Sequence, residues 1–324
     1  MSDQRFEWPA GARRDGRRLV LLREGYEGGD WPQSGTHPHA VRQWLLERQW
    51  FPVKWVNQLF SVGGIRMEED RIALEAFREA DLAADSLYRM AALPPVKTDR
   101  GGEAAVLFED DHVLVMDKPA GMPVHPSRQG ERGTLDEAAA RHLLLRGDPL
   151  PVRHIHRLDN ETSGPVLYSK NDLAQLRLDE AMRLKEIERI YVAFVQGTVR
   201  RRIGTVDAPI GRDRRHASRR RVATGGDSAR THYEVLEQYR DAALVRLRLE
   251  TGRTHQIRVH MSHIGHPLIG DSLYEGGTKW LAHQALHGER LLFAHPLHGG
   301  TVEVASPCPA WFERLRSMAE TAAL

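Results

Sequence analysis

The densest group of polar residues in the chain is the segment 156–164, which reads HRLDNETSG. Every residue in it except Leu158 is polar or small. On spacing alone the favoured interpretation is a helix start, because Asp159, Thr162 and Ser163 can accept hydrogen bonds from free backbone N–H groups. The alternative interpretation is that Asp159 is a catalytic carboxylate.

A second polar group, TGRTHQIRVH, occupies residues 251–260. It follows a predicted strand, begins with a glycine turn and predicts a short helix capped by Thr254. Four histidines in and after this group are spaced by five, three and three residues, so they cannot share one helix face. No cysteine or carboxylate accompanies them before Asp271. We therefore predict no metal site at His255, His260, His263 and His266.

Ten arginines and only three acids lie between residues 200 and 230. Two interpretations of this segment stay open. It is either a solvated surface or a surface that binds nucleic-acid phosphates, because one planar guanidinium can donate to two phosphate oxygens. The net charge of the whole chain, +2, does not distinguish between them.

The composition indicates a globular protein of about two domains, with 324 residues, 41% hydrophobic and 28% charged. No apolar run approaches the ~20 residues that cross a bilayer, and the charged N-terminal segment lacks the apolar core of a signal peptide. We therefore expect no membrane segment and a cytoplasmic location. The single cysteine, Cys308, lies between two prolines, and we expect a packing or surface role for it.

The hydrophobic pattern divides the chain into four parts. Residues 1–36 read as an irregular lead-in with one short strand. Residues 37–91 carry two amphipathic helices and a hairpin; this small domain resembles the alpha-L RNA-binding module of a small-subunit ribosomal protein, and its role is RNA binding or packing. Residues 92–102 form a linker rich in proline and glycine. In residues 103–324 strands outnumber helices, which predicts an α+β fold with a mixed, largely antiparallel sheet and flanking helices.

Four segments resemble, in the expected order, the motifs of RluA-type RNA pseudouridine synthases. Residues 117–126 (DKPAGMPVHP) resemble the family's lysine–proline motif, and residues 156–164 match its pattern HRLD, two variable residues, TSG. Residues 189–193 (RIYVA) resemble its tyrosine motif, and residues 251–261 (TGRTHQIRVHM) its third catalytic motif. The resemblance covers residues 106–309 and implies the pseudouridine synthase fold there.

The resemblance also implies a reaction, in which the bond from uracil N1 to ribose breaks, the base turns, and carbon 5 joins the ribose. It implies that Asp159 is the carboxylate at the sugar, as nucleophile or as base, with Arg258 keeping it ionised. Tyr191 would stack on the target base, and Arg157 would fill the space left by the flipped base, unless it pairs with nearby acids. No cofactor is required, because the isomerisation is redox-neutral. The other candidate RNA contacts are His156, Arg212, Arg219, Arg220 and Arg221.

Two rival functions stay open at the level of the sequence. A nucleosidase or glycoside hydrolase usually needs two carboxylates, whereas the motifs supply one clear acid with a basic partner. A non-catalytic RNA-binding or ribosome-assembly factor would keep the basic surface and the N-terminal module. For an enzyme, the first expectation is a uridine in large-subunit ribosomal RNA, with transfer RNA as the alternative. We expect RNA as the partner and a monomer as the oligomeric state.

Overall fold

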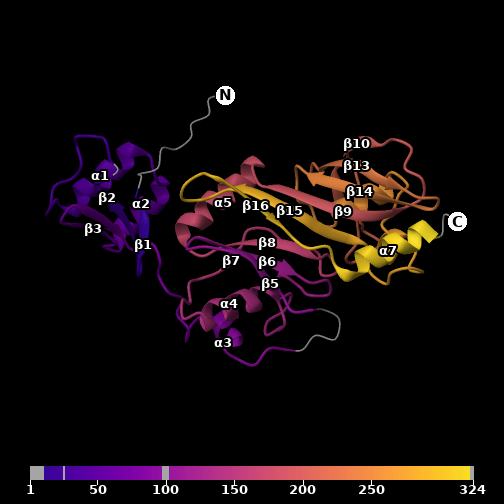
Figure 1. Cartoon of the computed structure of the whole chain (residues 1–324), viewed down its shortest axis with the longest axis horizontal. Helices are drawn as coiled ribbons and strands as arrows, with labels where there is room; N and C mark the ends of the chain where they lie inside the picture. Colours follow the sequence, from indigo (N-terminus) through magenta and orange to yellow (C-terminus); the bar gives the residue numbers. More distant parts are fainter. Residues whose placement is uncertain (1–10, 25, 97–101, 322–324) are drawn as a thin grey trace.

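The N-terminal part of the chain folds around a small antiparallel sheet. The computed structural model describes residues 11–24, 26–96 and 102–321 (Figure 1). The sheet has the strand order β1-β2-β4-β3 and is accompanied by two helices. These elements are β1 (Arg13–Asp15), β2 (Arg18–Leu22), α1 (Pro38–Arg48), α2 (Val53–Ser61), β3 (Ile65–Glu68) and β4 (Arg71–Leu74).

Apolar residues at helical spacing explain the two helices, as predicted. α1 has 11 residues and α2 has 9. α2 ends at Ser61, shortly before Gly63 adopts the left-handed conformation, with φ +69°. The predicted hairpin is confirmed, because β3 pairs antiparallel with β4. The buried apolar residues of the helices are Val41, Trp44 and Leu45 in α1 and Trp55, Val56 and Leu59 in α2.

The segment before residue 36 contributes more structure than an irregular lead-in. β2 pairs antiparallel with β4, and Leu21 lies opposite Ile72, so β2 completes the sheet of the hairpin. β1 pairs with β2 in turn. Its three residues are all charged, and they give no apolar pattern from which a strand could be predicted. The division of the chain into four parts stays a prediction.

An ion pair joins this N-terminal unit, residues 13–74, to the rest of the protein. The guanidinium of Arg14 donates to both carboxylate oxygens of Asp148, at 2.7 and 2.6 Å. Its Cζ atom also lies 4.6 Å from the centre of the Phe77 ring. A half-buried bidentate pair with a stacked ring fixes one geometry, because the guanidinium is rigid and planar.

Two antiparallel sheets form the larger unit, residues 102–321. Their strand orders are β5-β6-β8-β7 and β10-β13-β14-β9-β15-β16. Every pair of named strands in the described residues is antiparallel, so the predicted α+β fold with a largely antiparallel sheet is confirmed. The strands are β5 (Ala105–Glu109), β6 (Val113–Lys118), β7 (Arg153–His154), β8 (Gly164–Ser169), β9 (Glu188–Gln196), β10 (Ile203–Asp207), β13 (Arg230–Gln238), β14 (Ala242–Leu249), β15 (Leu286–Ala294) and β16 (Thr301–Ala305).

Short helices and a separate hairpin complete the larger unit. α3 precedes it in the chain and packs against α4. The hairpin consists of β11 (Ile210–Arg212) and β12 (Arg220–Val222). Among the described residues, no helix has the length and apolar character needed to cross a lipid bilayer. The helices are α3 (Ser86–Ala91), α4 (Leu135–Leu145), α5 (Asp172–Leu184), α6 (Gln256–His263), the 3-10 turn η1 (Ser272–Tyr274) and α7 (Ala310–Thr321).

Strand β9 lies between β14 and β15 and presents two different faces. Val192 and Phe194 pack with Trp311 of α7 in one apolar cluster. Tyr191, which points to the other face, belongs to the main core of the protein. Because side chains alternate along a strand, Arg189 shares the face of Tyr191. This face turns toward the segment 156–164.

The two sheets of the larger unit meet where β8 begins. Ser163 forms an isolated parallel bridge with His287 of β15, and the N–H of Gly288 donates to the carbonyl oxygen of Ser163 at 2.7 Å. Gly164 has φ +126°, and a Cβ atom there would lie 2.6 Å from backbone atoms of Gly288. Only glycine fits this approach. The contact fixes the end of the segment 156–164 against the six-stranded sheet.

We expect Gly164→Ala to lower the free energy of unfolding by about 3 kcal/mol, because it adds backbone strain and overlap with Gly288. Gly225→Ala is the matched control, since Gly225 has open space where a Cβ would lie. Its effect should stay below about 1 kcal/mol. Urea denaturation followed by circular dichroism measures both changes. Equal effects of the two substitutions would contradict the role assigned to the contact between Gly164 and Gly288.

Candidate active site

The turn that carries Asp159 rests on a buried lysine. Lys118, the last residue of β6, is fully buried. Its ammonium group has three carbonyl acceptors, and burial lowers the pKa of Lys118 to about 7. The acceptors fix the backbone directly after Asp159. They are the carbonyl oxygens of Pro119, Met122 and Asn160, at 2.9, 2.7 and 2.7 Å.

The helix start that spacing alone favoured at Asp159 is wrong. The N–H of Thr162 donates to the carbonyl oxygen of Asp159 at 3.0 Å, which closes a turn. Strand β8 then begins at Gly164. A helix cannot continue because Gly164, at φ +126°, is held against the backbone of β15. The side chain of Asp159 is therefore not used as a helix cap.

Asp159 forms an ion pair with Arg258, although 99 residues separate them in the chain. Nη1 of Arg258 lies 2.9 Å from Oδ2 of Asp159. Nε and Nη2 donate to both oxygens of Asp271, at 2.7 and 2.8 Å. Burial opposes the charge of Arg258, but hydrogen bonds and charge from Asp271 and Asp159 raise the pKa of Arg258 above its ordinary value. The side chain of Asp271 is 1% exposed and that of Asp159 is 23% exposed, so Asp159 is the accessible carboxylate.

A histidine approaches the same carboxylate from the start of α6. The hydroxyl of Tyr274 accepts the N–H of Arg220 at 2.9 Å and lies 2.8 Å from Nδ1 of His255. We assign the hydroxyl proton to the bond with His255, because the oxygen already accepts one hydrogen bond. The ring proton of His255 then sits on Nε2, 3.9 Å from Oδ2 of Asp159. Burial lowers the pKa of His255, so the ring is neutral near pH 7.

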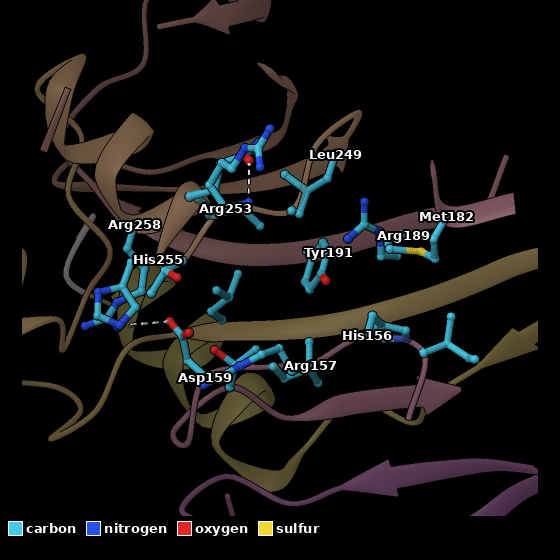
Figure 2. Close-up of a pocket in the computed structure, with 18 residues that line it drawn as sticks. His156, Arg157, Asp159, Met182, Arg189, Tyr191, Leu249, Arg253, His255 and Arg258 are labelled. Carbon is cyan, nitrogen blue, oxygen red and sulfur yellow. Dashed lines mark hydrogen bonds and ion pairs between the residues drawn. The ribbon is translucent and has the colours of Figure 1, made fainter. Parts of the chain in front are cut away.

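A cavity of about 300 Å³ opens beside these groups (Figure 2). Figure 2 shows Asp159, with its bond to Arg258, on one side of the cavity and Tyr191 of β9 facing it. Tyr191 is buried, and burial raises the pKa of its hydroxyl, although the positive charge of Arg189 opposes this rise; the charge of Asp159 adds a smaller increase. An aromatic ring, an accessible carboxylate and open space between them suit a planar base that stacks on the ring.

His156 and Arg157 line the same cavity in different ways. His156 is buried, and its Nε2 accepts the N–H of Leu167 at 3.3 Å. Burial lowers the pKa of His156 to about 3, so this ring is neutral. Arg157 is exposed, and its Nη1 lies 3.2 Å from Nε2 of His125. Within the described residues it pairs with no acid, so its guanidinium is available to a ligand.

The predicted arginine surface is split in two by strand β10. Arg200, Arg201 and Arg202 precede β10, whereas the other arginines follow it. On the hairpin, Arg212 lies opposite Arg220. Both line a cleft of about 330 Å³ next to α6. Only this second group of arginines lies beside the cavity of Asp159.

The arginine cleft and the cavity share one wall. Gly252, Arg253 and Thr254 line both spaces. Arg219 does not line the cleft; its Cζ lies 5.5 Å from the ring of Tyr274. Arg221 is exposed on β12. Of the hairpin arginines, Arg212 and Arg220 therefore lie next to the site, and their RNA-binding role stays a prediction.

Three of the four histidines near α6, His255, His260 and His266, have separate partners. Both ring nitrogens of buried His260 are occupied, by Thr231 Oγ1 at 2.8 Å and by the carbonyl oxygen of Ala208 at 2.9 Å. Nδ1 of His266 lies 3.0 Å from the carbonyl oxygen of Gln196 on β9. The described residues hold no group of three or more side chains that could bind a metal ion. The predicted Thr254 cap of α6 is wrong, because His255 occupies the cap position, with φ +59°.

Sequence reasoning assigned no role to Asp271 or Tyr274. Asp271 lies 13 residues after Arg258, which no helix or strand period relates to it. Its signals in the sequence are its place in the segment 266–271 (HPLIGD), which follows the third motif, and the preceding Gly270, whose φ of +81° marks a tight turn. Tyr274 is buried and has the sequence pattern of an ordinary core aromatic residue. Both residues act through contacts that exist only in the folded chain.

Comparison with known proteins assigns this site to a class. The sequence model of the RNA pseudouridylate synthase family matches residues 112–263. An uncharacterised RNA pseudouridine synthase of Bacillus subtilis, YhcT, is 46% identical over 216 residues, which are 66% of this chain and 72% of that protein. Ribosomal large subunit pseudouridine synthase D of Xanthomonas campestris pv. campestris is 41% identical over 230 residues, 65% of this chain and 68% of that protein.

A solved structure agrees with the fold. Human RNA Pseudouridylate Synthase Domain Containing 4 matches with a TM-score of 0.54 at 24% identity, over 65% of this chain and 92% of that chain. The family model and the relatives define the class of protein, an enzyme that modifies RNA. The chain belongs to the RNA pseudouridine synthase family, in its RluA-type branch, and its reaction is the isomerisation of uridine in RNA.

The buried His156 predicts a pH dependence of stability. Its pKa of about 3 in the folded state lies below the unfolded value of about 6.5. The unfolded chain therefore binds the extra proton, and stability falls as the pH drops below about 6.5. Replacement His156→Gln should reduce the loss of unfolding free energy between pH 7 and pH 5 by about 2 kcal/mol. Urea denaturation at both pH values measures this difference.

The exposed His263 provides the control. His263→Gln should leave the loss of unfolding free energy between the two pH values unchanged. If His156→Gln behaved like this control, the His156 ring would not be held neutral by burial.

Proposed function

We propose that this enzyme converts a uridine of large-subunit ribosomal RNA to pseudouridine with Asp159 as its nucleophile. The observation that carries the proposal is the pairing of an accessible carboxylate, Asp159, with the buried guanidinium of Arg258 at 2.9 Å. The guanidinium places a positive charge and a hydrogen-bond donor on Oδ2 of this carboxylate. An ionised carboxylate beside a cavity large enough for a base is what attack on a ribose requires.

The proposed reaction balances without a cofactor. A carboxylate oxygen of Asp159 attacks C1′ of the ribose, the bond from C1′ to N1 breaks, and its electron pair stays on the uracil. The base then turns, C5 bonds to C1′ as the ester with Asp159 breaks, and the proton on C5 is removed while N1 gains a proton, so that the product is neutral and Asp159 is a carboxylate again. Tyr191 stacks on the base and takes part in the proton transfer at C5.

The target nucleotide must leave its helix before it can reach the cavity, which costs a few kcal/mol. Arg157 supports this step because it is exposed at the cavity and pairs with no described acid. Its guanidinium fills the space that the base vacates and stacks on the neighbouring bases. The arginines of the β11–β12 hairpin contact the flanking phosphates.

The choice of large-subunit ribosomal RNA rests on the relatives that act on it by name, such as the enzyme of Xanthomonas campestris. The N-terminal unit adds a second RNA contact, through Lys54 and Arg66, which are exposed. Two other arginines of this unit, Arg42 and Arg48, are engaged internally. The Nε of Arg42 donates to Asn57 at 2.8 Å, and Arg48 lies 5.1 Å from the ring of Trp44.

We expect deletion of the gene to remove pseudouridine from one or a few positions of large-subunit ribosomal RNA. The wild-type gene should restore those positions, whereas Asp159→Asn should not, because the amide cannot form the ester with C1′. Pseudouridine mapping of total RNA measures this. The purified Asp159→Asn protein should bind the target RNA within about threefold of the wild-type affinity, since the ion pair and not the RNA contact is lost.

Three results would change the proposal. Loss of pseudouridine only from transfer RNA would show that transfer RNA, and not ribosomal RNA, is the substrate. Restoration of the modified sites by Asp159→Asn would show that Asp159 is not the nucleophile. Unchanged sites in the deletion strain would favour the non-catalytic RNA-binding factor.

Arg212 and Arg220 provide a separate prediction about RNA affinity. Arg212→Gln combined with Arg220→Gln should weaken binding to RNA of any sequence and reduce the slope of log affinity against log salt by about 1 to 2. Filter binding at several salt concentrations measures the slope. Arg200→Gln combined with Arg201→Gln is the matched control, because both residues are exposed and precede β10. If the control variant reduced the slope equally, the RNA contact could not be assigned to the hairpin arginines.

A further inference from the structure

One buried cation of the cavity, Arg189, has no counter-charge among the described residues. Arg189 of β9 is 8% exposed and lines the cavity beside Tyr191. Its Nε is buried without a hydrogen-bond partner. No carboxylate of the described chain forms an ion pair with its guanidinium. Arg258, in the same cavity, contacts two carboxylates.

A buried guanidinium without a partner is costly, so its position in a cavity indicates a ligand that supplies acceptors or negative charge. His156 and Tyr191, two described residues that line the cavity with it, supply neither negative charge nor a hydrogen bond to it. His156 is kept neutral by burial, with the charge of Arg189 adding to the effect. Tyr191 keeps its proton because burial raises the pKa of its hydroxyl. The guanidinium is therefore left to a molecule that enters the cavity.

The position of Arg189 relates it to the base rather than to the sugar. Arg189 and Tyr191 lie two residues apart on one strand, so both side chains point into the cavity. Figure 2 shows Tyr191 between Asp159 on one side and Arg189 on the other. The guanidinium reaches the opposite wall, where a Cβ on Gly252 would lie 2.7 Å from its Nη1. A base stacked on Tyr191 would thus have the nucleophile at one end and Arg189 at the other.

The reaction creates negative charge at that end. When the bond from N1 to C1′ breaks, its electron pair stays on N1 and is delocalised onto the two carbonyl oxygens of the uracil. The ester at Asp159 is neutral, so one negative charge has moved from the carboxylate to the base. A donor aimed at the place where charge develops stabilises the transition state more than the bound substrate.

We propose that Arg189 is a further catalytic residue, whose guanidinium donates hydrogen bonds to a carbonyl oxygen of the departing uracil and stabilises its negative charge. The inference rests on the proposed function, because it requires a uracil that leaves as an anion. It assigns a step to Arg189 that neither Arg258 nor Tyr191 performs. Arg258 is occupied by its two carboxylates, and the phenol of Tyr191 carries no positive charge.

The test compares two target nucleosides. Arg189→Met keeps an unbranched apolar chain and removes the charge, whereas Arg189→Lys keeps the charge. Single-turnover consumption of the target nucleoside is followed by chromatography of digested RNA, with uridine or 5-fluorouridine at the target position. Fluorine withdraws electrons and stabilises the uracil anion by itself. A residue that stabilises the leaving base therefore matters less for the fluorinated substrate.

We expect Arg189→Met to slow the uridine reaction by about 10²- to 10³-fold, the usual loss when one oxyanion donor is removed. The loss with 5-fluorouridine should be at least about tenfold smaller, and Arg189→Lys should retain most of the rate. The affinity for RNA should stay within about threefold. The melting temperature of Arg189→Met should be unchanged or higher, because an unpaired buried charge is removed.

Arg246→Met is the matched control, since Arg246 of β14 pairs with Glu289 of β15 and lies outside the cavity. It should change neither the rate nor the ratio between the two nucleosides. Equal losses with both nucleosides in Arg189→Met, or a rate equal to wild type, would overturn the role of Arg189. A fall in melting temperature with a matching fall in RNA affinity would make it a structural residue. Activity of Asp159→Asn would contradict the proposed nucleophile alone. The comparison of the two nucleosides is separate from it, because Asp159 is unchanged in every protein compared there.

Discussion

The ion array of Asp159, Arg258 and Asp271 is the constraint on which the rest of the structure depends. One guanidinium contacts both carboxylates, at 2.9 Å to Asp159 and at 2.7 and 2.8 Å to Asp271. A buried charge is tolerated only when it is paired and fully hydrogen-bonded. The turn that carries Asp159, the turn that carries Asp271 and helix α6, which carries Arg258, must therefore meet at a single point. The two sheets bring them together there.

Three different supports fix that meeting point. Lys118 holds the turn after Asp159 through the carbonyl oxygen of Asn160. Gly164 allows this turn to approach the backbone of β15. On the other side, the hydroxyl of Tyr274 links His255 to the backbone N–H of Arg220 on the hairpin. Each support is a specific contact of few atoms, so the carboxylate is positioned by rigid elements rather than by a mobile loop.

The sequence predicted what is local and what the family motifs contain. The helices around Trp44 and Trp55, the hairpin after Gly63 and the largely antiparallel sheet follow from periodicity and turn residues. The helix start at Asp159 was wrong because a local cap pattern cannot register the contact of Gly164 with β15. Asp271 and Tyr274 were missed for the same reason, since their partners lie on other elements and leave no trace in spacing.

The charges of the cavity explain why its histidines stay neutral. His156 is buried beside Arg189, and its pKa is about 3; His255 is buried beside Arg258, and its pKa is lowered as well. Two buried guanidinium groups, of Arg189 and Arg258, thus line the cavity with one accessible carboxylate, while Asp271 is withdrawn from it. Near neutral pH this balance does not change with protonation of the rings. A reaction that moves one negative charge from Asp159 to a bound base would therefore transfer it from one guanidinium to the other, without any change in the net charge of the site.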